Sequence, residues 1–117
     1  MNIEELRNYC LSLPGVTEDF PFDEVTLVFK VGGKMFLLTS LEGDFSFNVK
    51  CDPEQAIQLR ERYECVRPGY HMSKKHWNTV DIDGSVADSL LIDWINHSYE
   101  LVFGALPKRI RDSILLS

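Results

Sequence analysis

Two adjacent glycines between two apolar runs constrain the fold of this chain more than any other feature. Residues 25–31 and 34–39 are rich in β-branched and aromatic side chains with partial alternation, which is typical of strands. Gly32 and Gly33 lie between them and can adopt the positive φ angles of a tight turn. The sequence therefore predicts an antiparallel hairpin. A phosphate-binding loop is disfavoured because a strand, not a helix, follows the glycines.

Three more segments are predicted to be extended. Residues 45–51 follow a turn at 42–44 and place alternate apolar side chains on one face. Residues 65–67 and 77–83 are rich in the same strand-forming types, whereas the segment around residues 19–22 is predicted to be a loop. The chain should thus contribute about five strands.

Capping residues and periodicity predict four helices. The first spans about residues 3–13, between an N-cap at Asn2 and the Pro14-Gly15 pair. Asp52 caps the second, which Pro53 opens. Ser85 with Asp88 predicts a capping box for the third, and Pro107 opens the fourth. Their predicted inward stripes are Ala56, Leu59 and Tyr63; Leu91, Trp94, Ile95, Ser98, Val102 and Ala105; and Ile110, Ile114 and Leu115.

Hairpins bracketed by helices favour an α+β class, with an antiparallel sheet of about five strands and helices packed against it. A length of 117 residues suits one domain, so residues 1–117 are expected to form a single unit. No apolar run is long enough to cross a bilayer and no export signal is recognised, which predicts a cytoplasmic location.

Charge is distributed unevenly along the chain. The formal net charge is −6, and the whole excess lies in residues 1–64. Such a balance argues against broad adhesion to nucleic acid or anionic membrane. Residues 65–80 are the exception, because they hold Arg67, Lys74, Lys75 and two histidines but no acid.

No constellation for catalysis, a metal or a cofactor is recognised. The cysteines Cys10, Cys51 and Cys65 form no C-x-x-C pair, and we expect all three to be reduced and mostly buried. His71 and His76 are five residues apart in a predicted loop, which is not a metal-ligand spacing on a helix. We therefore predict a protein that is not an enzyme and needs no cofactor.

The basic window leaves two interpretations open. Its cations alternate with aromatic residues, a composition that can contact phosphates by charge and bases by stacking. Alternatively, Pro68, Tyr70, Met72 and Trp77 fix a long hairpin to the core while the lysines are solvated. Trp77 is in either case expected to pack against the sheet or the third helix.

The same window resembles the MmcQ/YjbR-like family of small bacterial proteins, whose pattern is V-R-P-x-x-H-[ML]-x-K-x-H-W-x-T-V. The residues that fit are Val66, Arg67, Pro68, His71, Met72, Lys74, His76, Trp77, Thr79 and Val80. The resemblance extends over essentially the whole chain. It implies a fold similar to the CyaY/frataxin group and a role as predicted DNA-binding proteins with a double-wing motif.

Two functional classes follow. In the first, a monomer binds double-stranded DNA weakly through a basic loop or wing at residues 67–76. The residues predicted to bind are Arg67, Tyr70, His71, Lys74, Lys75 and His76. In the second, an apolar patch between the first helix and the sheet, involving Phe20, Phe22 and Trp77, binds a small ligand or an unidentified protein partner.

Overall fold

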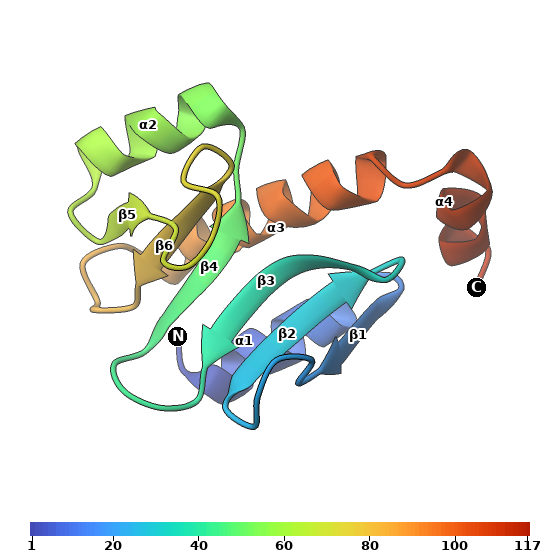
Figure 1. The fold of residues 1–117 in the computed structure, drawn as a ribbon, viewed down its shortest axis with the longest axis horizontal. Coiled ribbons are helices and arrows are strands. Elements are labelled where there is room, and N and C mark those ends of the chain that lie inside the picture. Colours follow the sequence, from blue (N-terminus) through green and yellow to red (C-terminus); the bar gives the residue numbers. More distant parts are fainter.

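The computed structural model describes residues 1–117 and contains one six-stranded, fully antiparallel sheet (Figure 1). Its strand order is β1-β2-β3-β4-β6-β5. The strands are β1 (Val16–Asp19), β2 (Thr26–Val31), β3 (Lys34–Ser40), β4 (Ser46–Lys50), β5 (Val66–Pro68) and β6 (Trp77–Asp81). The helices are α1 (Ile3–Ser12), α2 (Pro53–Arg62), α3 (Asp88–Gly104) and α4 (Lys108–Leu115). The predicted α+β class is confirmed.

The sixth strand is β1, which the sequence did not predict. Its four residues pair with β2, from Val16 opposite Val31 to Asp19 opposite Val28. A four-residue segment that ends in two acids has little strand propensity of its own. It is extended because the exposed edge of β2 supplies backbone partners, a contact that a local pattern cannot reveal.

The predicted β2–β3 hairpin is confirmed, with both turn glycines at positive φ (57° and 79°). Gly32 is also needed for packing, because a Cβ there would lie 2.6 Å from Leu106 Cδ1. The register shifts beside Phe29, so one residue of β3 is extra. The neighbours Phe36 and Leu37 are consequently both fully buried, which strict alternation does not allow.

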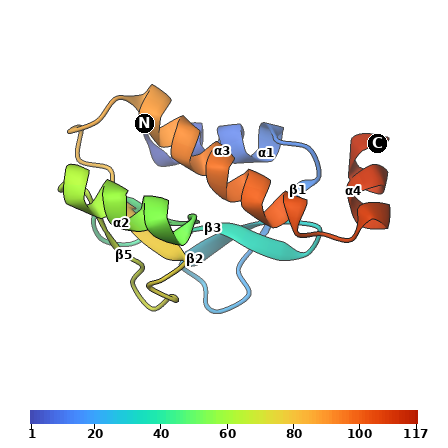
Figure 2. The ribbon, with the colours of Figure 1, turned by 90° about the horizontal axis from the view of Figure 1, so that it is seen from above.

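Helices α1 and α3 cover one face of the sheet (Figure 2). Asn2 caps α1 in a capping box with Glu5, and Asp52 caps α2 by accepting from the Gln55 N–H. The main core lies between these helices and the sheet. It contains Leu6, Cys10, Leu27, Phe29, Val31, Phe36, Leu37, Phe47, Val49, Cys65, Val66, Val80, Leu91, Trp94, Ile95, Val102 and Leu106.

Three local predictions about the last two helices are wrong. Ser85 does not cap α3; its N–H donates to Asp83 Oδ1, and Ala87 precedes the helix without a side-chain cap. Ala105 is exposed because α3 ends at Gly104, and Leu106 is buried instead. Leu115 is 64% exposed, since only part of α4 reaches the core.

The opposite face of the sheet has a much smaller apolar cluster. Val28, Leu38 and Trp77 are buried there, with Met35 and Met72 packed against them. Trp77 is 8% exposed, so its predicted structural role is confirmed, and it packs on the sheet face away from the main core. No helix in the structure is both long and apolar enough to span a membrane.

Candidate binding groove

A groove of about 640 Å³ lies on this second face of the sheet. Two loops project from the sheet on the side away from α1 and α3, one between β1 and β2 and one between β5 and β6 (Figure 2). Both loops contribute to the groove walls. The lining residues are Phe22, Thr26, Leu38, Thr39, Ser40, Ser46, Phe47, Asn48, Arg67, Tyr70, His71, Met72 and Thr79.

The floor of the groove follows from strand register. Val28 lies opposite Leu38, Leu38 opposite Asn48, Asn48 opposite Thr79, and Thr79 opposite Arg67. Because directly opposite residues share a face, these five side chains form one row across five strands. The row changes from apolar at β2 to cationic at β5. The Thr79 hydroxyl donates to Asn48 Oδ1, which leaves the Asn48 amide hydrogens free.

The wall from the β5–β6 loop is fixed by hydrogen bonds at both ends. At its start, the Tyr70 N–H donates to Thr79 Oγ1 over 2.9 Å, and the Gly69 N–H donates to the Trp77 carbonyl. The Tyr70 and His71 rings lie together, with centroids 4.0 Å apart. His71 has φ 58°, a left-handed conformation that histidine tolerates better than most residues.

Arg60 of α2 holds the other end of the same loop. Its guanidinium donates to Asn78 Oδ1 over 2.7 Å, to the Trp77 carbonyl over 3.2 Å, and to the Lys74 carbonyl. Nothing in the sequence pattern singled out Arg60, because its acceptors are two backbone carbonyls and a side chain more than ten residues away.

The wall from the β1–β2 loop is organised by Asp23. Its carboxylate accepts from the N–H groups of Val25 and Thr26 and from the Thr26 hydroxyl. The backbone bonds from Val25 and Thr26 hold the pKa of Asp23 below its usual range. Phe22 lies at the rim of this wall with 63% of its surface exposed, and Tyr70 on the other wall is 62% exposed.

Charge in the groove is nearly balanced. Arg67 is the one permanently charged residue that lines it. Its guanidinium forms two hydrogen bonds to the Asp81 carboxylate, Nε to Oδ2 over 2.8 Å and Nη2 to Oδ1 over 2.9 Å. These bonds raise the pKa of Arg67, and the pair leaves little net positive charge for a phosphate.

Known proteins resemble this chain over most of its length. The family model YjbR matches residues 11–101. This chain belongs to the YjbR family. The uncharacterized protein YbdF of Escherichia coli O157:H7 is 41% identical over 107 residues, covering 91% of this chain and 88% of YbdF. The uncharacterized protein YjbR of E. coli K12 is 34% identical over 112 residues, covering 95% of each protein.

Solved structures agree with this membership. The crystal structure of Deinococcus radiodurans protein DR2400, with the family-model domain DUF419, matches at a TM-score of 0.92 and 40% identity. The match covers 99% of this chain and 89% of DR2400. A Pseudomonas syringae protein matches at a TM-score of 0.75 and 24% identity, covering 87% and 99%, and supports the fold alone. The predicted family resemblance is confirmed.

The six residues predicted for DNA are all exposed, and half of them line the groove. Arg67, Tyr70 and His71 line the groove, whereas the other three lie outside it. The Lys74 ammonium donates to the Gly69 carbonyl over 3.2 Å. Lys75 is exposed without an acidic partner, and His76 is exposed with its carbonyl bonded to the Cys51 N–H.

The prediction that an apolar patch lies between the first helix and the sheet is wrong about the location of the concave surface. That interface is filled by the main core, and the concave surface lies on the opposite face. Phe22 lines the groove, Phe20 does not, and Trp77 packs in the apolar cluster on the groove's side of the sheet. The polar floor, including Thr26 and Asn48, was missed. Its signal in the sequence is the alternation itself, because Ser46 and Asn48 point away from the face that carries Phe47 and Val49.

The three cysteines are unpaired and buried, as predicted. Burial raises the pKa of the Cys10 thiol to about 12 and that of Cys51 to about 11. Both thiols are therefore protonated near neutral pH, which is unfavourable for nucleophilic attack or metal ligation. No group of three metal-ligating side chains is close enough to hold an ion.

Proposed function

We propose that this YjbR-family chain is a non-enzymatic binding module that holds a small, flat, polar ligand in the groove on the open sheet face. The observation that carries the proposal is the pairing of two exposed aromatic walls, Phe22 and Tyr70, with a floor of hydrogen-bonding side chains. Ligand sites commonly combine apolar and aromatic surfaces with a few placed polar groups.

Shape favours a small molecule over a protein partner. Residues of both loops line the groove, and both loops project from the sheet (Figure 2), so a flat protein surface cannot reach the floor. A volume of about 640 Å³ lies within the ordinary range for small-ligand sites. Exposed aromatic faces stack on flat rings, and Asn48 offers free amide hydrogens to an acceptor at the edge of such a ring.

The protonated state of two cysteine thiols and the contacts of His71 support the proposal that the module is not an enzyme. Burial keeps the Cys10 and Cys51 thiols protonated, and neither cysteine lines the groove. Among the groove residues the candidate general base is His71. Its ring lies against Tyr70 and accepts no hydrogen bond from a serine or cysteine that it could activate.

A titration followed by ¹H–¹⁵N NMR tests the proposal, with adenosine, cytidine, nicotinamide and riboflavin as probes. We expect saturable shifts for at least one probe at the amides of Asn48, Tyr70 and Thr79. Phe22→Ala should weaken that binding about five-fold or more, since stacking on an aromatic side chain contributes about 1–3 kcal/mol. Phe20→Ala is the matched control, because Phe20 is exposed but does not line the groove. Equal effects of the two variants, or no saturable shift with any probe, would contradict the proposal.

Weak binding of duplex DNA is the second candidate. It is favoured by one observation: Lys74 and Lys75 are exposed in a loop without acids, and neither forms an ion pair. Because Arg67 is paired with Asp81, two phosphate contacts are expected. The logarithm of the affinity should then fall with the logarithm of salt concentration with a slope of about −2, and Kd should be no tighter than about 10⁻⁶ M.

Fluorescence anisotropy with labelled duplex DNA at about 50 and 200 mM salt tests this candidate. Replacing Lys74 and Lys75 by alanine should abolish most of the binding. The matched control replaces Lys34 and Lys108, which are exposed elsewhere and change the net charge equally. If both double variants lose binding, the DNA affinity depends on the overall charge of the protein, and the loop is rejected as the DNA site.

A further inference from the structure

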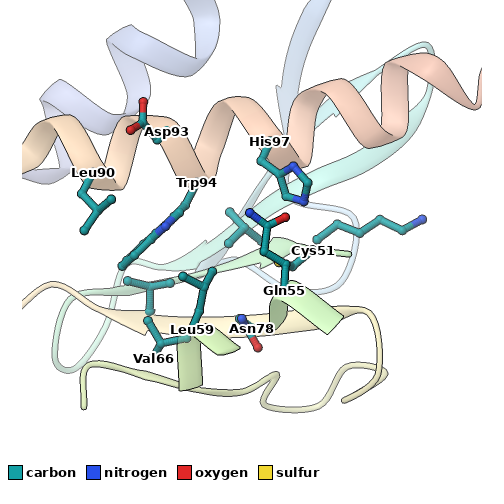
Figure 3. A pocket seen from close by; sticks show the side chains of 12 residues that line it. Cys51, Gln55, Leu59, Val66, Asn78, Leu90, Asp93, Trp94 and His97 are labelled. Carbon is teal, nitrogen blue, oxygen red and sulfur yellow. The ribbon is translucent and has the colours of Figure 1, made fainter. Parts of the chain in front are cut away.

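A second cavity, of about 230 Å³, lies on the other side of the sheet between α2 and α3 (Figure 3). It is separate from the groove, because its floor is the covered face of the sheet. The lining residues are Val49, Lys50, Cys51, Gln55, Leu59, Val66, Asn78, Val80, Leu90, Asp93, Trp94 and His97.

Most of the inner surface of this cavity is apolar. Val49, Val66 and Val80 come from three adjacent strands, and Leu59 and Trp94 come from the two helices. The Tyr63 ring packs edge-on against Trp94, with centroids 5.2 Å apart, and fixes the indole in place. Such a surface suits a ring or a branched aliphatic group, and a cavity of about 150 Å³ is known to hold benzene.

Hydrogen-bonding groups without protein partners face this apolar surface. The Gln55 amide and the Trp94 indole N–H form no hydrogen bond within the protein, and both side chains line the cavity. His97 Nε2 accepts from the Asp52 N–H over 3.2 Å, so the neutral ring carries its proton on Nδ1. In Figure 3 the Gln55 amide from α2 and the His97 ring from α3 point toward the cavity, while the Asp93 carboxylate points away.

Two other neutral polar side chains of the cavity, Asn78 and Cys51, are not available to a ligand. Asn78 uses Oδ1 for Arg60 and Nδ2 for the Ala56 carbonyl. Cys51 is buried, and its raised pKa keeps the thiol protonated. Lys50 and Asp93 also line the cavity, and both are charged. The neutral donors left for a ligand are thus Gln55, Trp94 and His97, and the neutral acceptor is the Gln55 carbonyl.

We propose that this α2–α3 cavity binds a small molecule with one ring or branched apolar group and a carbonyl-bearing head, best a carboxamide. The apolar part would lie against the valines, Leu59 and Trp94. The head would pair with the Gln55 amide, which can donate to a carbonyl and accept from an amide N–H, with His97 as a second donor. The site does not depend on the function proposed for the groove.

Phenylacetamide is the probe, titrated into ¹⁵N-labelled protein and followed by NMR. The Trp94 indole resonance and the Gln55 side-chain amide should shift and saturate with a Kd of about 1 mM or tighter. Trp77 is an internal control, because its indole packs on the opposite face of the sheet. A shift of both indoles to the same extent, or no saturation by about 10 mM probe, would overturn the proposal.

A matched pair of variants on α2 sharpens this test. Gln55→Ala removes an exposed side chain without internal hydrogen bonds, so folding should be unaffected, and phenylacetamide should bind about three- to ten-fold more weakly. Gln58→Ala is the control, since Gln58 is exposed on the same helix but does not line the cavity. Ethylbenzene, which has the ring but no head group, should bind more weakly than phenylacetamide. Equal binding by both variants, or by both probes, would refute the assigned head-group contact.

Discussion

The two faces of the sheet use the same strands for different purposes. On the covered face, α1 and α3 complete a core of 17 buried residues. On the open face, three buried residues and two methionines form a small cluster beside a polar groove. Because alternate residues of a strand point to opposite faces, each strand contributes to both. The main core and the candidate site are therefore separated by the thickness of one sheet, so each can be perturbed with little effect on the other.

The largest effect is expected for truncation on the covered face. Phe29 is fully buried in the main core, and Phe29→Ala should reduce the free energy of unfolding by about 3–5 kcal/mol. Urea denaturation followed by circular dichroism measures this. Phe22→Ala on the open face should change stability by less than about 0.5 kcal/mol, because Phe22 is largely exposed. Similar losses in the two variants would break the separation of the faces.

A smaller loss is expected for Trp77→Ala. Trp77 is as buried as Trp94, yet its cluster contains just Val28, Leu38 and two methionines that can move into the space. We expect a cost of about 3 kcal/mol, at the lower end for large aromatic truncations. The same urea measurement tests it. An unchanged free energy of unfolding would mean that Trp77 serves the groove and does not stabilise the fold.

The next smaller loss of stability is expected when a polar contact on the covered face is removed. Ser98 Oγ donates to the Phe36 carbonyl over 2.5 Å and accepts from the Lys50 N–H over 2.8 Å, which joins α3 to β3 and β4. Ser98→Ala leaves both backbone groups without this partner and should cost about 1–3 kcal/mol. Ser40→Ala is the control from the open face, because its hydroxyl bonds to Glu42 at an exposed position. Equal stability of the two variants would argue that the Ser98 bridge contributes nothing.

The smallest effect is local and depends on pH. Hydrogen bonds hold the pKa of folded Asp23 below its ordinary value of 3.8. The stabilisation of the β1–β2 loop is therefore fully present above about pH 4 and is lost as the pH falls through the folded pKa. Amide exchange at Val25 and Thr26 should accelerate in acid while the β3 amides stay protected. Asp23→Asn should make these two amides exchange faster already at neutral pH, and wild-type rates there would contradict the assigned bonds.

Much of the fold could be predicted from the sequence because its signals are local. The Gly32-Gly33 turn, the Asn2 and Asp52 caps and the stripe through Leu91 and Ile95 depend on neighbours within a few residues, and the structure confirms them. The edge strand β1 could not be predicted, because its extended form depends on pairing with β2.

The candidate site was predicted in part. Residues 69–76 form a loop as predicted, whereas Arg67 and Pro68 belong to β5. Four residues of the window 67–76 line the groove, namely Arg67, Tyr70, His71 and Met72. Composition could not show that Asp81 neutralises Arg67, since β5 and β6 must pair before the two side chains meet. Nor could it show that Asn48 and Thr79 share the groove floor, since that depends on strand register.

Five of the six strands, the four helices, the caps of α1 and α2 and the position of the basic loop follow from the sequence alone, because each depends on short-range geometry and periodicity. The tertiary structure decided which face of the sheet stays open and which charges are paired. It also decided which polar side chains gather at the groove and at the α2–α3 cavity. Those properties depend on contacts between residues far apart in the chain, and strand order and register specify them only once the whole sheet is assembled.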